Sequence, residues 1–463
     1  MTHRRLRYVP HVLTAAAFAG TLIVAVVARA AGAGDDAQAG AAAGANSWCA
    51  RIPPGFGHPP INLTPVTLQL VRPSVEPVPA TDGLIHLFYV AQVTNTQATR
   101  AGIVGVVPVD ALAGFTPTGS NLITDPMGRD AAGKVQLFAT VPLRDLPREI
   151  TADDLYPAPV PPFSTQMPAG NSGLMYFDVT YTDPAQVPHL LAHAITLATP
   201  DGGEPGVPGL TDPVPVGCKE LAVLRPPLVG HGWFATHGCC TVAGYHQNDV
   251  PGLNGTLKAG EQFAIDYLQL GPDGTCCNGP VRALTSWLGY GTPVLAAAPG
   301  VVVAAVDGIP DQEPVLTIAF PPPLTGTVPG TSGNAGNSVI EDIGGGRYIT
   351  YGHFKPGSIP AWVRAGAHLN AGDLIGRVGN SGGSVAPHMH FQVADDPSGS
   401  GLEAAGLPFV FDTQLLEGRA PEGVEPELFH RVPFTIDRTG AGRVQRGLMP
   451  ERNGIFGYNL SPN

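Results

Sequence analysis

The chain has 463 residues, enough for two or three domains, and it combines 60 glycines and 49 prolines with only 13% charged residues. Glycine and proline interrupt helices and mark turns, so this composition favours β-structure over helical bundles. The formal net charge of −12 argues against a nucleic-acid-binding protein, because phosphate contacts require clustered lysine and arginine.

Residues 1–30 have the pattern of an export signal. Three arginines stand within the first seven residues, residues 12–28 are almost wholly apolar, and Ala28 and Ala30 offer small side chains for cleavage. An uncleaved membrane anchor is the alternative, because the apolar run is near the lower length limit for a span. We therefore expect an exported protein, periplasmic or extracellular, that contacts a membrane only if this segment is retained.

Loss of residues 1–30, which contain four arginines and no acidic residue, would change the formal charge from −12 to −16. Partners are therefore expected to be uncharged or cationic. The following residues 31–48 are rich in alanine, glycine and aspartate, so they are predicted to form a disordered linker.

Residues 49–224 are predicted to form an all-β domain. Apolar or alternating runs between proline, glycine and aspartate turns indicate strands at residues 63–71, 84–95, 173–183 and 192–198. Frequent turns without a long helical pattern predict an immunoglobulin-like β-sandwich. Its histidines His86, His189 and His193 are interpreted as ordinary residues of strand faces.

A proline-rich stretch at residues 224–230 marks the expected boundary of a second domain. In the strand that follows, Phe263, Ile265 and Tyr267 share one face and Asp266 lies on the other. A carboxylate on the polar face of a strand could reach a metal that histidines of neighbouring strands hold.

The sequence GNSGGSVAPHMHFQV, residues 379–393, places two histidines on one side of a predicted strand. His388 and His390 alternate with Met389 and Phe391, so the imidazoles share a face while the apolar side chains point into the core. Such a pair suits metal binding or proton transfer, and two ordinary surface histidines are the alternative. Upstream, Ile349, Tyr351 and His353 are predicted to share a strand face.

Residues 351–354, 379–382 and 387–391, with the glycine-punctuated segment between them, resemble the lysostaphin-type zinc endopeptidases, also called LytM domains. That family has a Tyr-x-His-Leu strand and a Gly-Asn-Ser/Thr-Gly turn before Pro-His-Leu-His-Phe. The resemblance covers roughly residues 291–393. It implies an antiparallel β metallopeptidase domain, here residues 225–412, followed by a C-terminal extension at 413–463.

The resemblance implies one zinc ion held by His246, Asp266 and His390, with His353 and His388 as the catalytic histidines. The family usually has its first histidine and aspartate four residues apart. Here His246 and Asp266 are twenty apart, similar to a family variant in which an insertion separates them. Two substitutes for them, His237 and Asp249, therefore stay open.

Members of this family cut short peptides in bacterial peptidoglycan, so the implied function is a secreted or periplasmic zinc metalloendopeptidase acting on peptidoglycan cross-links. The alternative is a non-catalytic LytM-type regulator or binding protein of cell-wall hydrolases, although such proteins typically lack a metal-site residue. Another possible substrate is a secreted protein with Gly-Gly bonds, as in elastin-like degradation.

The six cysteines of an exported chain suggest disulfides. A Cys49–Cys218 bond would join the ends of the first domain. At least one bond is expected between the adjacent pairs 239–240 and 276–277, because a bond within such a pair requires a strained ring. A four-cysteine zinc site is the alternative for these pairs.

Overall fold

The computed structural model describes residues 66–121, 166–197, 209–314, 333–397, 403–424 and 431–459, apart from residues 97, 99, 100, 168, 169, 171, 241–244, 249 and 254. The predicted export signal, the linker and Cys49 lie outside this part of the chain. All described residues lie within one compact unit. None of the helices in the described ranges is long and apolar enough to cross a bilayer.

The first part of the described chain forms two antiparallel sheets with a common apolar core. The strands described in one sheet are β1 (Val66–Leu70), β2 (Val78–Pro79), β3 (Ile85–Asn95), β6 (Ser120–Asn121) and β8 (Ser172–Tyr181). Those described in the other are β4 (Ala101–Asp110), β5 (Thr116–Pro117), β7 (Gln166–Met167), β9 (Leu190–Leu197), β10 (Gly209–Leu210) and β11 (Val214–Pro215). The predicted strands correspond to β1, β3, β8 and β9, and the all-β prediction is confirmed; the immunoglobulin-like connectivity stays a prediction.

Strand β3 is buried on both faces, which explains its almost continuous apolar sequence. Tyr89 lies in the core between the two sheets and stacks on Phe177 of β8, with ring centroids 4.8 Å apart. Phe88, one residue earlier, points the other way and packs in the core of the second part of the chain. The carbonyl of Phe88 also accepts a hydrogen bond from Gln262 Nε2 at 3.2 Å.

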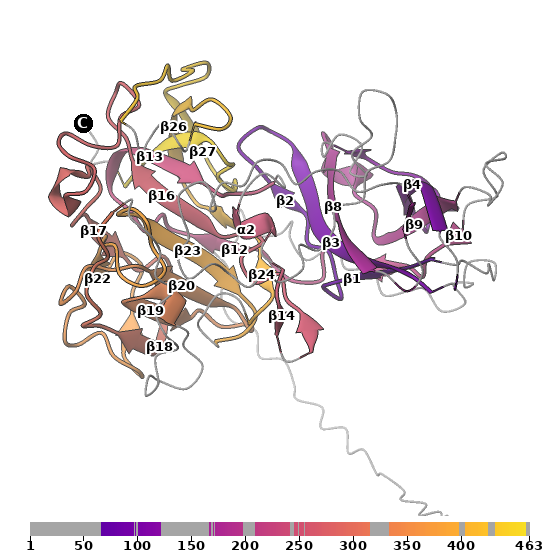
Figure 1. The fold of residues 1–463 in the computed structure, drawn as a ribbon, viewed down its shortest axis with the longest axis horizontal. Helices are drawn as coiled ribbons and strands as arrows, with labels where there is room; N and C mark the ends of the chain where they lie inside the picture. Colours follow the sequence, from indigo (N-terminus) through magenta and orange to yellow (C-terminus); the bar gives the residue numbers. More distant parts are fainter. Residues whose placement is uncertain are drawn as a thin grey trace, which may run out of the picture. The chain divides into compact units, whose positions relative to one another are not determined.

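The second part of the described chain is organised on one large sheet, which has eleven strands among the described residues. Their order is β21-β18-β19-β20-β23-β16-β13-β28-β26-β27, and β24 pairs with β23. The bounds are β13 (Gly230–Thr236), β16 (Ile265–Gln269), β18 (Gly300–Val306), β19 (Ser338–Asp342), β20 (Tyr348–Gly352), β21 (His368–Leu369), β23 (Met389–Ala394), β24 (Gly406–Leu407), β26 (Gln414–Arg419), β27 (Arg443–Gln445) and β28 (Gly454–Tyr458). In Figure 1, β13, β16, β23, β20, β19 and β18 follow one another across this sheet.

Short elements connect and flank the large sheet. The described two-stranded pairs are β12 (Ala222–Leu224) with β25 (Phe409–Phe411), β14 (Gly252–Leu253) with β15 (Thr256–Leu257), and β17 (Pro293–Leu295) with β22 (Leu374–Arg377). The helical turns are α2 (Tyr245–Asn248), η2 (Pro184–Gln186), η3 (Leu284–Ser286) and η4 (Gly333–Ala335).

The residues after 412, about which the sequence pattern said little, contribute strands β26, β27 and β28 to the large sheet. Strand β28 pairs antiparallel with β13, and Phe456 and Tyr458 of β28 are fully buried in the core of the second part of the chain, hereafter the central core. The segment set apart as a C-terminal extension therefore supplies part of the framework on which β13 and β16 lie.

The cysteine arrangement differs from the prediction. Cys239 and Cys240 are disulfide-bonded to each other, and the buried sulfurs of Cys276 and Cys277 lie 2.6 Å apart. The expected bond between the two pairs is therefore wrong, because Cys239 packs in the central core while Cys276 and Cys277 pack in a separate cluster. The disulfide also removes two thiolates from the proposed four-cysteine zinc site. Cys218 is disulfide-bonded.

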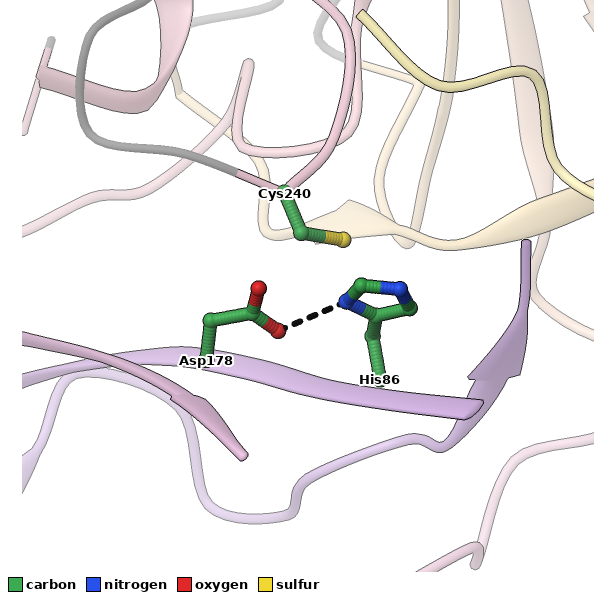
Figure 2. A group of neighbouring side chains, drawn as sticks. All are labelled: His86, Asp178 and Cys240. Atoms are coloured by element: carbon green, nitrogen blue, oxygen red, sulfur yellow. Dashed lines mark hydrogen bonds and ion pairs between the residues drawn. The ribbon is translucent and has the colours of Figure 1, made fainter. Parts of the chain in front are cut away.

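His86 of β3 is buried between carboxylates and lies beside Cys240 (Figure 2). Its Nδ1 donates to Asp178 Oδ1 at 2.8 Å and its Nε2 donates to Asp82 Oδ2 at 3.2 Å. Burial opposes a charge on the ring, but hydrogen bonds to Asp178 and Asp82 raise the pKa of His86 to about 10. Both ring nitrogens are thus donors in an ion-paired imidazolium, which agrees with a structural role.

This ion pair predicts a loss of stability at alkaline pH. The folded pKa of His86 lies above its ordinary value, so its contribution is complete below about pH 6.5 and decreases as pH rises through 10. In urea unfolding between pH 7 and 10, the free energy of unfolding should fall more for the wild type than for His86→Gln. The exposed His189 supplies a control, since His189→Gln should follow the wild type. Equal pH slopes for wild type and His86→Gln would contradict the ion pair.

Candidate metal centre

The hydrogen-bonded register of four neighbouring strands places the residues of the candidate site in one row across the large sheet. Asp266 of β16 lies opposite His390 of β23, and His390 in turn lies opposite Gly352 of β20. On the other side of β16, Thr236 of β13 lies opposite Asp266. Directly opposite residues on neighbouring strands have Cβ atoms about 4.5–5.5 Å apart, which is within reach for side chains that converge on one ion.

The Asp266 carboxylate lies at the centre of a buried group of imidazoles. Its Oδ1 atom is 3.0 Å from His390 Nδ1 and 3.3 Å from His388 Nε2. Its Oδ2 atom is 3.0 Å from His237 Nδ1 and 3.4 Å from His246 Nε2. The two carboxylate oxygens therefore each face two histidines.

His353 completes this group, but not from the predicted strand face. Ile349 and Tyr351 point into the apolar core, whereas the His353 ring lies 4.5 Å from the His388 ring and 5.8 Å from the His390 ring. The predicted common face of the three residues is wrong, because His353 follows the end of β20 with φ at +62°. This left-handed conformation, uncommon outside glycine, turns the side chain away from the core.

The structure thus brings together all five residues that the sequence analysis assigned to the site: His246, Asp266, His353, His388 and His390. His237, named as a substitute, lies in the same group, also with a left-handed backbone at φ +56°. Asp249, the other substitute, lies outside the described residues. His246 reaches the site from α2 rather than from a strand.

Sequence reasoning missed Glu261. This buried residue precedes β16, and its Oε2 atom lies 3.9 Å from His246 Nε2. The sequence offered one indication of its role, because Glu261 and Asp249 are the only acidic residues between the two candidate ligands His246 and Asp266. Glu261, His246 and His390 form one group with potential ligand atoms within 4.8 Å of one another, and His237, His246 and Asp266 form another.

Hydrogen bonds outside the cluster orient the two candidate ligand histidines. His246 Nδ1 donates to the Ala264 carbonyl at 3.3 Å, so its Nε2 lone pair faces Asp266. His390 Nε2 donates to Gln392 Oε1 at 2.8 Å, which turns its Nδ1 toward Asp266. An outward N–H bond that directs the other nitrogen inward is the usual arrangement of a metal-bound histidine.

This donor set fits a zinc-type dication. With the outward protons placed as above, the lone pair of His390 Nδ1 meets the Asp266 carboxylate across 3.0 Å, and a proton or a cation between them removes the repulsion. Imidazole nitrogens and a carboxylate oxygen are ordinary zinc ligands. His246, Asp266 and His390 are therefore a suitable set for one divalent ion.

The ionisation of these groups agrees with metal binding. Burial alone would raise the pKa of Asp266, but attraction to His246 and His388 and hydrogen bonds from His237 and His388 hold it well below its usual value. Burial lowers the pKa of His246 to about 3, against the opposing attraction of Asp266. Burial also opposes charge on His390, but Asp266 and Glu261 raise the pKa of His390 to about 9. The two carboxylates thus favour positive charge at this position, as they would favour a bound cation.

The other two histidines are held by the loop from 379 to 388. His353 Nδ1 donates to the Ser381 carbonyl at 2.8 Å, and His388 Nδ1 donates to the Ala386 carbonyl at 2.7 Å. The Ser384 hydroxyl lies 3.1 Å from the same nitrogen of His388. Burial lowers the pKa of His353 well below its ordinary value, so the ring is neutral and its Nε2 carries a lone pair.

Gly379 opens this loop because no side chain fits there. A Cβ atom at this position would lie 2.2 Å from the backbone nitrogen of Lys355, a contact too close for any other residue. The glycine-rich motif thus allows the loop to pack against the backbone that follows His353.

Comparison with known proteins gives a match to peptidase family M23 at residues 286–400. This range contains His353, His388 and His390, while His246 and Asp266 precede it. A search of curated proteins finds no match.

Among solved structures, the chain is similar to the catalytic domain of the prophage-encoded M23 protein EnpA from Enterococcus faecalis, with 20% identity, TM-score 0.22, and coverage of 40% of this chain and 93% of that one. The catalytic domain of lysostaphin from Staphylococcus simulans has 21% identity and TM-score 0.19, covering 38% of this chain and 84% of that one. A zinc-containing peptidase from Vibrio cholerae has 15% identity and TM-score 0.16, covering 46% and 79%. At these values the structural similarities add nothing to the argument from the site. The sequence match identifies residues 286–400 as a domain of peptidase family M23.

Proposed function

We propose that this chain is an exported zinc metalloendopeptidase that hydrolyses peptide bonds in peptidoglycan cross-links. The observation that carries the proposal is the buried Asp266 carboxylate, which faces His246 and His390 with two further imidazoles, His353 and His388, on the same side of the sheet. The M23 domain supports the peptide substrate, since members of this family typically hydrolyse cell-wall peptidoglycan. The predicted signal at residues 1–30 supports export.

His246, Asp266 and His390 would hold the ion, and His237 would orient Asp266 through its 3.0 Å hydrogen bond to Oδ2. When bound, zinc would lower the pKa of a water ligand toward neutrality and polarise the scissile carbonyl. A carboxylate and two neutral imidazoles leave the set open to a further ligand.

His353 and His388 would manage protons on the substrate side. His353 would accept a proton from the attacking water at Nε2, because its hydrogen bond to the Ser381 carbonyl keeps the ring proton on Nδ1. His388 Nε2, 3.3 Å from Asp266 Oδ1, would donate a hydrogen bond to the developing oxyanion. The proton accepted by His353 would then go to the leaving amine.

The regulatory alternative would be favoured by a missing or displaced metal ligand. The 3.0 Å distance between Asp266 Oδ1 and His390 Nδ1 supports the catalytic proposal instead. Peptides rich in glycine or D-amino acids offer little side chain to recognise, so the choice of bond would depend on the shape of the substrate groove.

Replacement of His390 by alanine should abolish zinc binding. Loss of a residue that only hydrogen-bonds a metal ligand typically weakens metal affinity 10–100-fold, so loss of the ligand itself should weaken zinc affinity by about 100-fold or more. Zinc content and a competition titration with a chelator measure this. His368→Ala, at an exposed position of β21, is the matched control and should retain full affinity. Unchanged zinc binding in His390→Ala would remove His390 from the ligand set.

Replacement of His388 by alanine should leave zinc in place but reduce kcat/KM by about 10²–10⁴-fold, the usual contribution of one acid–base group. The comparison requires variants with equal zinc content and equal far-UV circular dichroism. Full activity of zinc-loaded His388→Ala would exclude this histidine from the mechanism.

Digestion of purified peptidoglycan tests the substrate directly. The chain from Gly32 onward, with zinc supplied, should produce new peptide termini that mass spectrometry assigns to one bond, and His390→Ala should produce none. Intact cross-links with confirmed zinc loading would favour the regulatory alternative. If the enzyme instead cleaves only the Gly-Gly bonds of an elastin-like polypeptide, the substrate would be a secreted protein rather than peptidoglycan.

A further inference from the structure

Glu261 is a second buried carboxylate at the centre. It lies in the turn that enters β16, where its carbonyl accepts a hydrogen bond from Ala264 N at 2.9 Å. This turn directs the Glu261 carboxylate toward the candidate ligands, with Oε2 at 3.9 Å from His246 Nε2. The ligand atoms available on Glu261, His246 and His390 all lie within 4.8 Å of one another.

The spacing is that of neighbouring ligands rather than of a hydrogen bond. N–H···O hydrogen bonds are about 2.7–3.2 Å long, and the 3.9 Å between Glu261 and His246 exceeds this range. Zinc–nitrogen and zinc–oxygen bonds of about 2.0–2.2 Å in a tetrahedron separate two ligand atoms by roughly 3.3–3.6 Å. The 3.9 Å between His246 Nε2 and Glu261 Oε2 is close to that value, and the potential ligand atoms of Glu261, His246 and His390 lie within 4.8 Å of one another. Asp266 approaches His246 at 3.4 Å through Oδ2 and His390 at 3.0 Å through Oδ1.

Charge balance favours the same arrangement. A dication held by Asp266 and two neutral imidazoles would keep one uncompensated positive charge in a buried site, which is unfavourable. Glu261 supplies the second negative charge.

We propose that Glu261 is a fourth protein ligand of the metal, alongside His246, Asp266 and His390. This inference rests on the ligand set of the proposed function and extends it. Four protein ligands close a tetrahedral zinc site, whereas catalytic sites keep a position for water. The resting centre is therefore closed, and hydrolysis requires the Glu261 carboxylate to leave the ion.

Cobalt substitution of the full chain tests the ligand directly, because the visible absorption of Co²⁺ changes with its coordination. We compare the wild type with Glu261→Ala and Glu261→Gln, and measure the spectrum and the Co²⁺ affinity by chelator competition. Both variants should show an altered spectrum and an affinity at least about tenfold lower. Glu341→Gln is the control, since Glu341 is a buried carboxylate outside the site, bonded to Tyr351 OH at 2.5 Å, and it should retain the wild-type spectrum and affinity.

An unchanged spectrum would overturn the proposal, including the case in which affinity falls, because Glu261 would then act from outside the coordination sphere. If Glu261→Ala fails to fold by circular dichroism, Glu261→Gln decides by the same two criteria. Neither readout involves a peptide. A protein that cleaves no peptidoglycan but shows the Glu261-dependent spectrum would refute only the proposed function, and an active peptidase with an unchanged spectrum would refute only this inference.

Discussion

The structure of the site depends on one electrostatic constraint, an ionised carboxylate buried among imidazoles. Asp266 faces two histidine nitrogens with each oxygen, and outward hydrogen bonds from His246 and His390 direct their remaining nitrogens toward it. Such a group is unstable in a low-dielectric interior unless positive charge lies within it. Protons can supply that charge, and the donor atoms are equally suited to a dication.

The large sheet gives this constraint its geometry. Asp266 and His390 are direct neighbours across β16 and β23, so their approach follows from hydrogen-bonded register and not from side-chain flexibility. The flanking strands β13 and β20 end at the same row, and their following residues, His237 and His353, turn toward it in left-handed conformations. A site placed on paired strands is more rigid than one placed on loops, which favours catalysis that requires accurate positioning.

Segments distant in sequence stabilise this sheet. Strand β28, near the end of the chain, lies beside β13 and buries Phe456 and Tyr458 in the central core. Phe88, in the first β-region near the beginning of the described chain, packs into the same core. Its carbonyl accepts a hydrogen bond from the side chain of Gln262, four residues before Asp266. The first β-region thus contacts the framework of the candidate metal centre through strand β3.

Sequence periodicity by itself determined the local part of the site. Alternation in residues 263–267 and 388–391 correctly separated core side chains from Asp266, His388 and His390, because strand side chains have a period of two and the burial of one face fixes it. The tertiary structure decided what periodicity does not encode. The orientation of His353 depends on a positive φ after the strand, the cysteine pairing depends on which core each pair joins, and the position of Glu261 depends on a turn that faces His246. Each of these is a relation between segments that meet only when the chain is folded.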